Sequence, residues 1–378
     1  MTVVHVITGL GGGGAEAVLH RLIQQRQAND RHVVISLTTG GVYGPKLEAL
    51  GARVVALGVA RGRVSITALG RLKTLIADVA PDVVQTWMYH ADLAGGIASR
   101  LAGCRAVVWG VHSSNLDPPA TRGMTRWVAG VCARLSSIVP VSIVCCSEAA
   151  SRVHAALGYC KDKLVVISNG VDLTEFRPNL EGRLAIRAEL GMPNDVPLIG
   201  MVGRWDPLKD HLGFIRALSG LQDRMPGPWR VLLVGAGIDA DNETLANAIT
   251  TAGLADRVLC LGLRTDVPAL MNAIDLHVLP SIGESFGNVT VEAMACGTPA
   301  IVTDVGAGEF IVGDTGWVVP AAAPSLLAET MFGALLGLTD VGAWQQRRAA
   351  ARARAHDHFG VAQMQAAYRA VWQRAVVG

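Results

Sequence analysis

The stretch Ser281 to Thr303, SIGESFGNVTVEAMACGTPAIVT, contains the local pattern on which the fold assignment rests. Asp275 to Pro280 precedes it, and this short apolar run ended by a proline is typical of a buried strand. Ser285 to Asn288 is polar and contains a glycine, which favours a helix start, and apolar residues then recur near the helical period. Gly297 to Pro299 ends that helix, and a second apolar run begins at once. The stretch therefore predicts a strand, a turn, a helix and a second strand.

Two carboxylates lie in this stretch, Glu284 and Glu292, with seven residues between them. Glu284 falls in the loop, and Glu292 falls about one and a half turns into the helix, at ~3.6 residues per turn. They are too far apart to share a proton. The N–H groups of Phe286, Gly287 and Asn288 at the helix start would instead face a phosphate, and each glutamate would hold a hydroxyl on one side of it. A sugar-diphosphate-ribose has that layout; the alternative is a capping residue and a solvated helix residue.

The same pattern repeats along most of the 378 residues. Apolar strands alternate with amphipathic helices, which predicts parallel, doubly wound sheets. The length suggests two domains, and the sharp turn from Ser168 to Asp172 is the expected hinge between residues 1–170 and 171–355. Near the end of the chain, Met364, Tyr368 and Trp372 form a helical stripe that must pack on something.

Two features of the first half are candidate ligand contacts. Gly12 and Gly13 lie between a strand at Val3 to Ile7 and a helix expected at Ala17 to Gln27, where glycines let a ligand approach the backbone. A dinucleotide fingerprint is the competing interpretation, but no well-placed acidic residue ends the second strand. His112 directly follows an apolar strand, so it is either a residue of a binding cleft or a capping histidine.

The second half offers basic residues at equivalent positions. Arg204 and Lys209 follow the strand Pro197 to Val202, where a diphosphate would need positive charge; pairing with surface carboxylates is the alternative. The loop with Leu263 and Arg264 follows another strand and could hold a base.

Composition and charge restrict the location and the partners. Residues 1–170 carry a net charge of +8 and residues 171–378 carry −6, which suggests different partners for the two halves unless the difference is chance drift. Arg122, Arg126 and Trp127, within Pro118 to Gly130, suit an acceptor or membrane-surface face. Seven cysteines without framework spacing fit a reducing cytoplasm, and we see no signal peptide and no apolar run of ~18 residues. The expected location is cytoplasmic, with a peripheral position at the inner face of the membrane as an option.

Taken together, these motifs resemble the family 4 glycosyltransferases, retaining enzymes with the GT-B fold that use a nucleotide-activated sugar. The resemblance covers nearly the whole chain. It rests on GGAE at residues 13–16, Ser168 to Asp172 with Phe176, Gly203-Arg204 with Lys209, and Pro280 to Pro299 with its two glutamates. It implies two Rossmann-like, doubly wound domains that face a cleft. It also implies that a last helix, residues 356–378, crosses back to the first domain.

The resemblance also implies roles for individual residues. Glu292 would hold the ribose hydroxyls, and Glu284 would contact hydroxyls of the donor sugar. The remaining roles are diphosphate binding by Arg204 and Lys209 with the amides of Gly287 and Asn288, cleft lining by Gly12 and Gly13, sugar contact by His112, and base contact by Leu263 and Arg264. Glu284, His112, Arg204 and Lys209 would be the catalytic set. One residue departs from the pattern, because Lys209 is followed by Asp210 where many members have glycine.

The implied chemistry needs no metal and no cofactor, because the nucleotide sugar is the donor substrate. Positive side chains and a helix start would stabilise the leaving diphosphate, and that phosphate would take the acceptor proton. UDP is the expected nucleoside diphosphate of the donor. The expected acceptor is a glycan or a lipid-diphosphate-linked molecule in cell-surface polysaccharide synthesis, and no nucleic-acid partner is expected. Two alternatives keep the fold. A sugar-nucleotide epimerase would need extra carboxylates, which we do not find, and a non-catalytic binder would not need the four charged residues at 204, 209, 284 and 292.

Overall fold

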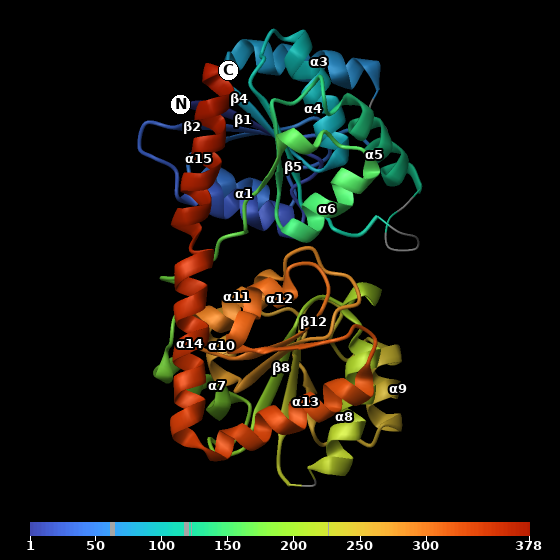
Figure 1. Ribbon diagram of the computed structural model, residues 1–378, viewed down its shortest axis with the longest axis vertical. Coiled ribbons are helices and arrows are strands. Elements are labelled where there is room, and N and C mark those ends of the chain that lie inside the picture. Colours follow the sequence, from blue (N-terminus) through green and yellow to red (C-terminus); the bar gives the residue numbers. More distant parts are fainter. Residues whose placement is uncertain (61–64, 117–120, 122, 226) are drawn as a thin grey trace. The chain divides into compact units, whose positions relative to one another are not determined.

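The computed structural model describes residues 1–60, 65–116, 121, 123–225 and 227–378. The chain divides into two compact units: unit 1 is Met1–Gly170 with Val361–Gly378, and unit 2 is Val171–Gly360 (Figure 1). The second boundary falls five residues after the expected break at 355, because α14 (Val341–Phe359) continues unbroken through that point. Pro118 and Arg122, from the segment expected to form an acceptor or membrane face, lie outside the described residues.

Unit 1 contains a parallel sheet whose described strands run in the order β3-β2-β1-β4-β5-β6-β7. The strands are β1 (Thr2–Ile7), β2 (Arg31–Ser36), β3 (Arg53–Ala56), β4 (Val83–Trp87), β5 (Val107–Val111), β6 (Ser142–Cys145) and β7 (Leu164–Val166). The helices are α1 (Gly14–Gln24), α2 (Tyr43–Ala49), α3 (Ile66–Val79), α4 (Tyr89–Leu101), α5 (Gly123–Leu135), α6 (Glu148–Leu157), the 3-10 turn η1 (Lys161–Lys163) and α15 (Val361–Val377).

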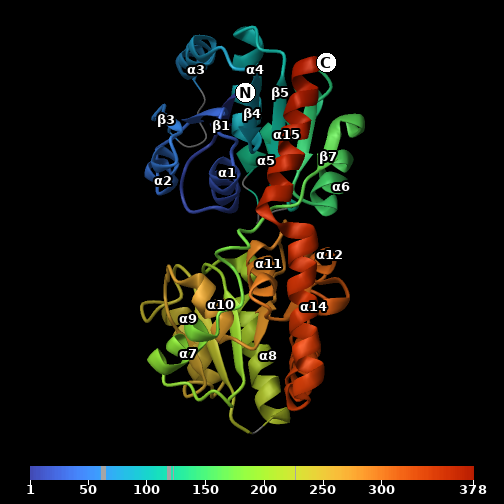
Figure 2. The ribbon, with the colours of Figure 1, turned by 90° about the vertical axis from the view of Figure 1, so that its left-hand side faces the viewer.

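Helices cover both faces of this sheet, which explains why its strands are apolar at nearly every position. Val3 and Ile7 of β1 lie in the same buried cluster as residues of α1 and α15. Val4 and Val6 point to the opposite face and lie with residues of α3 and α4. Figures 1 and 2 show α15 running alongside the sheet together with α1. The last helix therefore supplies part of the core of unit 1.

Unit 2 repeats the architecture with a parallel sheet in the order β10-β9-β8-β11-β12-β13 for the strands described there. The strands are β8 (Leu198–Val202), β9 (Arg230–Val234), β10 (Val258–Cys260), β11 (Leu276–Leu279), β12 (Ala300–Thr303) and β13 (Trp317–Val319). The helices are α7 (Leu180–Glu189), η2 (Pro207–Lys209), α8 (His211–Arg224), α9 (Glu243–Thr251), α10 (Val267–Ala273), α11 (Asn288–Ala295), α12 (Gly308–Val312), η3 (Gly313–Thr315), α13 (Pro324–Leu336), η4 (Gly337–Thr339) and α14.

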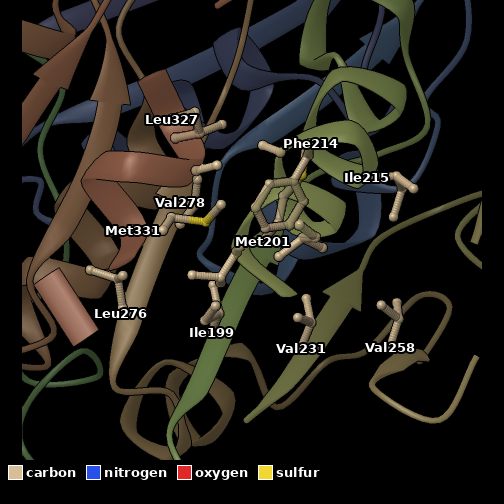
Figure 3. Close-up of a cluster of buried hydrophobic side chains, with 14 of the residues drawn as sticks. Ile199, Met201, Phe214, Ile215, Val231, Val258, Leu276, Val278, Leu327 and Met331 are labelled. Atoms are coloured by element: carbon tan, nitrogen blue, oxygen red, sulfur yellow. The ribbon is translucent and has the colours of Figure 1, made fainter. Parts of the chain in front are cut away.

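One face of this second sheet packs on α8 and α13. Ile199 and Met201, alternate residues of β8, are fully buried in a cluster with Phe214 of α8 and Met331 of α13 (Figure 3). Period-two burial of this kind fixes the register of the strand, since a slip by one residue would turn these side chains to the other face.

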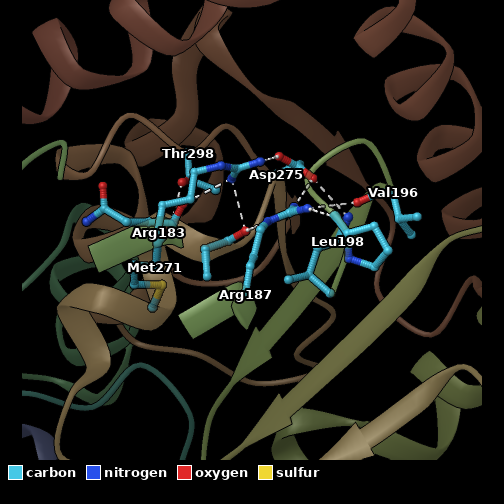
Figure 4. Close-up of polar contacts among 10 residues, drawn as sticks. Arg183, Arg187, Val196, Leu198, Met271, Asp275 and Thr298 are labelled. Atoms are coloured by element: carbon cyan, nitrogen blue, oxygen red, sulfur yellow. Dashed lines mark hydrogen bonds and ion pairs between the residues drawn. The ribbon is translucent and has the colours of Figure 1, made fainter. Parts of the chain in front are cut away.

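A buried ion-pair group holds the starts of β8 and β11 together. The carboxylate of Asp275 accepts hydrogen bonds from Arg183 at 2.7 Å and Arg187 at 2.6 Å, both in α7, and from the backbone N–H of Leu198 at 2.9 Å (Figure 4). The side chain of Arg187 is only 1% exposed. Because both strands are fixed at their amino ends, the positions of their carboxyl ends are also determined.

No single helix among the described residues is long and apolar enough to cross a membrane. Pro324–Thr339 and Val341–Phe359 meet such a test only as a pair, by length and composition, and they are bent by 115° at their junction.

Candidate functional site

In unit 2 the strand order reverses between β8 and β11. Sheets of this type bind ligands beyond the carboxyl ends of the strands that flank such a reversal. The loops after these two strands carry Lys209 and Glu284, whose ammonium and carboxylate form a close ion pair. Their side chains are 16% and 17% exposed. Two residues that the sequence analysis singled out from loops 75 positions apart are therefore in contact.

Two short caps hold Lys209 in place. The Asp206 carboxylate accepts from the N–H of Leu208 at 2.9 Å at the start of η2, and Asp210 accepts from the N–H of Gly213 at 2.9 Å at the start of α8. Asp210 has φ 51° and ψ 47°, the left-handed conformation that glycine adopts most easily. Aspartate tolerates it better than most residues and also supplies the helix cap. The departure from glycine at this position therefore preserves the turn.

The loop that carries Glu284 is held by close backbone packing. Gly306 has φ +62°, and a Cβ there would collide with the carbonyl oxygen of Glu284. The Glu284 carboxylate also accepts from the N–H of Ser285 at 3.1 Å. Only glycine at 306 therefore lets the loop after β12 lie against the loop that presents this glutamate.

The helix α11 begins where the sequence predicted a phosphate-binding turn. Gly287 is its N-cap residue in a left-handed conformation, with φ 96°. The ring of Phe286 is 3% exposed and packs edge-on against Phe359, with centroids 5.9 Å apart. The Phe286 side chain is therefore a core residue, and only its backbone N–H remains available for the predicted contact. Glu292, on the second turn of α11, is 7% exposed, which is unusual for a carboxylate.

Both predicted arginines pair with carboxylates, which is the alternative that the sequence left open for Arg204. Arg204, with a side chain 59% exposed, pairs with Asp206 at 2.7 Å. Arg264 pairs with Asp266 at 2.6 Å and with Glu189 of α7 at 2.8 Å. Leu263, beside it, is 77% exposed. An anionic ligand that bound Arg204 would therefore compete with a carboxylate already in place.

Two buried histidines lie near Lys209. Burial and the nearby Lys209 lower the pKa of His277, in β11, to about 3. Burial also lowers the pKa of His211, at the start of α8, to about 4. Both imidazoles are therefore neutral at pH 7, so they add no positive charge that would compete with Lys209 for an anion.

The predicted residues of unit 1 lie at the carboxyl edge of its own sheet, whose strand order reverses between β1 and β4. Gly12 is exposed, and a Cβ there would meet nothing within 4 Å. Gly13 is the N-cap residue of α1, where a Cβ would collide with the Glu16 carboxylate. The helix begins at Gly14 rather than at Ala17, because the end of the glycine run forms part of the first turn. The negative charge of Glu16 in that turn interacts favourably with the helix dipole.

His112 directly follows β5 and is half-buried. Burial lowers the pKa of His112 to about 4, so its ring is neutral at pH 7. Next to it, Met88 at the end of β4 has φ 71° and ψ 156°, a conformation that only glycine adopts without strain. Tyr368 of α15 and Trp87 are neighbours of His112 that no local sequence pattern indicates, although the helical stripe containing Tyr368 predicted a packing partner.

Family models match both parts of the chain. Residues 12–175 match the model described as Glycosyltransferase Family 4, and residues 196–335 match the model described as Glycosyl transferases group 1. A D-inositol 3-phosphate glycosyltransferase of Nocardia farcinica is 36% identical over 56% of this chain and 47% of that protein. The UDP-Gal:alpha-D-GlcNAc-diphosphoundecaprenol alpha-1,3-galactosyltransferase of Escherichia coli is 28% identical over 61% of this chain and 60% of its own length. The chain thus spans about half the length of these curated relatives.

The solved structures support the same fold. HepE of Anabaena, in complex with UDP and glucose, matches with a TM-score of 0.86 and 23% identity over 99% of this chain and 100% of that one. WaaG, a glycosyltransferase involved in lipopolysaccharide biosynthesis, matches with a TM-score of 0.73 and 16% identity over 98% of each chain. The two predicted parallel-sheet domains are thus confirmed as a GT-B fold. With the two family models matching its successive halves, this chain belongs to the family 4 glycosyltransferases.

Proposed function

We propose that this chain transfers a sugar from a UDP-sugar, with retention of configuration, to a glycan or lipid-linked acceptor during synthesis of a cell-surface polysaccharide or glycoconjugate. The observation that carries the proposal is the ion pair between Lys209 and Glu284 at the strand reversal of unit 2, beside the start of α11 and the buried Glu292. A cation, a helix start and two carboxylates suit a ligand that has a charged centre and hydroxyl groups at both ends.

Each part of the donor then has a partner. The diphosphate meets Lys209, the exposed Arg204 and the backbone amides of Gly287 and Asn288. Glu284 accepts from hydroxyls of the sugar. The buried carboxylate of Glu292 accepts from the two adjacent ribose hydroxyls, which would offset the cost of keeping a charge out of water.

Two further groups complete the proposed set. Leu263 and Arg264 border the base, and the exposed position of Leu263 leaves an apolar surface free for a ring. In unit 1, Gly12 leaves its backbone open to a ligand, Gly13 lines the same turn, and His112 contacts the donor sugar.

The relatives support the choice of donor and acceptor. HepE is described in complex with UDP and glucose, and the name of the Escherichia coli relative specifies UDP-galactose and a diphosphoundecaprenol-linked acceptor. We extend only the shared chemistry to this chain, namely a UDP-sugar donor and an acceptor that carries a glycan or a lipid diphosphate.

In the proposed reaction the bond between the anomeric carbon and the diphosphate breaks while a bond to the acceptor oxygen forms. The leaving diphosphate gains negative charge, which Lys209, Arg204 and the start of α11 stabilise, so the reaction does not need a resident metal. The acceptor proton passes to a diphosphate oxygen on the same face of the sugar. Attack from that face gives the product the same anomeric configuration as the donor.

We also propose that unit 1 meets the inner membrane surface from the cytoplasmic side when the acceptor is lipid-linked. Residues 1–170 carry a net charge of +8, and Met124 and Trp127 of α5 are 57% and 63% exposed. Flotation with anionic and with neutral vesicles tests this part, because a protein that stayed in solution with both would rule it out.

The experiment that tests the reaction is product analysis. The protein is incubated with a UDP-sugar and a lipid-diphosphate-linked acceptor, and the anomeric proton of the product is observed by NMR as it forms. We expect a new glycosidic signal with the configuration of the donor. Formation of the opposite anomer would contradict retention, and conversion of the donor into another sugar nucleotide would indicate an epimerase.

A further inference from the structure

The ring of His112 is supported on one face and at one edge by neighbours within unit 1. Its imidazole stacks on the indole of Trp87, with centroids 5.2 Å apart and planes 23° apart. Its Nε2 lies 3.4 Å from the hydroxyl oxygen of Tyr368, a residue of α15 that is 256 positions away in the sequence. Its backbone N–H donates to the sulfur of Met88 at 3.4 Å.

We propose that Tyr368 is a positioning residue for the transfer reaction, because its hydroxyl donates to Nε2 of His112 and so fixes the imidazole in the form that carries hydrogen on Nδ1. The inference rests on the proposed function, in which His112 contacts the donor sugar. It adds a residue of the last helix, and a defined tautomer of the histidine, to that site.

The direction of the hydrogen bond follows from burial. Tyr368 is 1% exposed, and a buried hydroxyl hydrogen without an acceptor is strongly disfavoured. Burial raises the pKa of Tyr368 well above its usual value, so the group remains a hydroxyl donor at neutral pH. Burial lowers the pKa of His112 to about 4, so its ring is neutral and has one nitrogen free to accept. With Nε2 accepting from Tyr368, the ring hydrogen lies on Nδ1.

The remaining N–H is the group that would act on the ligand. Nδ1 of His112 is buried and has no hydrogen-bond partner within the described part of the chain. A donor without a protein partner favours the arrival of an oxygen atom. An N–H at this atom stabilises a sugar oxygen that carries partial negative charge, whereas the other tautomer would present a lone pair and repel it.

The position of Tyr368 is itself fixed by its neighbours on α15. Arg369 forms an ion pair with Asp30, and the indole N–H of Trp372 donates to the side-chain oxygen of Gln85 at 3.0 Å. The ring of Tyr368 also stacks on Trp87, with centroids 5.8 Å apart. The hydroxyl is therefore held in place before any ligand binds, as a positioning group requires.

The test compares Tyr368→Phe with a matched control, Tyr159→Phe. Tyr368→Phe removes the hydroxyl and keeps the ring on Trp87. Tyr159 is another buried tyrosine of unit 1, 2% exposed, whose ring contacts Trp109 and His154. Donor turnover gives kcat and KM, thermal unfolding reports the fold, and NMR of the histidine-labelled full chain reports the tautomer of His112.

In the wild type we expect the NMR signature of hydrogen on Nδ1. In Tyr368→Phe we expect loss of that signature and a kcat about tenfold lower, with the KM for the donor and the melting temperature little changed. Tyr159→Phe should match the wild type in both kcat and tautomer. Hydrogen on Nε2 in the wild type would overturn the proposal, and so would an unchanged kcat in Tyr368→Phe or an equal loss in the control. Because the tautomer is measured without a substrate, this test remains valid even if the wild type turns over no UDP-sugar, an outcome that counts against the proposed function alone.

Discussion

Replacing Glu284 with glutamine should strengthen binding of UDP without strengthening binding of the UDP-sugar. In the ligand-free protein the Glu284 carboxylate forms an ion pair with the ammonium of Lys209, so an incoming diphosphate must displace that carboxylate. Two unit charges 4 Å apart interact by about 4 kcal/mol at an effective dielectric constant of ~20. Both side chains are about one-sixth exposed, and solvent screening reduces the net value to about 1 kcal/mol. Since about 1.4 kcal/mol corresponds to a factor of ten, the Kd for UDP should fall about fivefold.

Calorimetric titration of the wild type and Glu284→Gln with UDP and with UDP-glucose measures both effects. The UDP-sugar should bind the variant no more tightly than the wild type, because the amide is a weaker acceptor for sugar hydroxyls than a carboxylate. Glu243→Gln is the control, since Glu243 is exposed on α9 of the same unit and its substitution makes the same change in net charge. An unchanged or weaker affinity of Glu284→Gln for UDP would refute the reasoning.

Three further perturbations follow from the structure of unit 2. Asp275→Asn should lower the unfolding free energy by about 3–5 kcal/mol, because it leaves a buried guanidinium without its charged partner, and thermal denaturation followed by circular dichroism will measure the loss. Gly306→Ala should reduce donor turnover strongly, because the new methyl group would push away the loop that carries Glu284, and steady-state kinetics with each donor checks it. Acidification from pH 7 to 5.5 should destabilise the fold by about 1.2 kcal/mol for each of His211 and His277, as measured by urea denaturation.

The sign of the pH effect follows from the two states of each histidine. In the folded chain the pKa of His211 is lowered to about 4 and that of His277 to about 3, whereas the unfolded chain titrates near the ordinary value of about 6.5. The unfolded state therefore binds more protons below pH 6.5, and stability is lost as the pH falls from there. Burial raises the pKa of Asp92 in unit 1 to about 7, which opposes the loss of stability by about as much as one histidine contributes. Burial also lowers the pKa values of His32 and His112 in unit 1 to about 4, which adds to the loss. A stability that rose on acidification would contradict the assignment.

Controls separate these effects from general loss of fold. Gly333→Ala lies in α13 at a position where a Cβ would meet nothing within 4 Å, so it should leave turnover unchanged and raise stability by about 0.5–1 kcal/mol. If Gly333→Ala lost as much turnover as Gly306→Ala, the effect at Gly306 would not arise from the loop of Glu284.

The fold was predictable because its evidence is local in the sequence. Each apolar run, such as Ile199 to Val202, is followed by a turn and an amphipathic helix, and parallel sheets place all such turns at one edge. That rule alone puts the loop of Lys209 near the loop of Glu284 once the two strands are neighbours. Their neighbouring position in the sheet is seen only in the structure.

The remaining features depend on packing between distant segments, which sequence patterns do not reveal. The stripe that contains Tyr368 was recognisable as a buried face, but its contact with His112 depends on where α15 returns to the sheet of unit 1. The carboxylate partners of Arg204 and Arg264 depend on loop conformation. Asp210 departs from the glycine common at this position of the family pattern, and the sequence does not reveal that its left-handed backbone and its capping bond maintain the turn after Lys209.

The most direct test of the account is donor hydrolysis without an acceptor, measured across UDP-, GDP- and ADP-sugars, with Glu292→Ala as the control. We predict release of the nucleoside diphosphate from a UDP-sugar, and loss of that turnover when the buried carboxylate of α11 is removed. The claim that the strand reversal of unit 2 holds the nucleotide sugar would be contradicted if no donor showed turnover or saturable binding. It would also be contradicted if Glu292→Ala left the turnover intact.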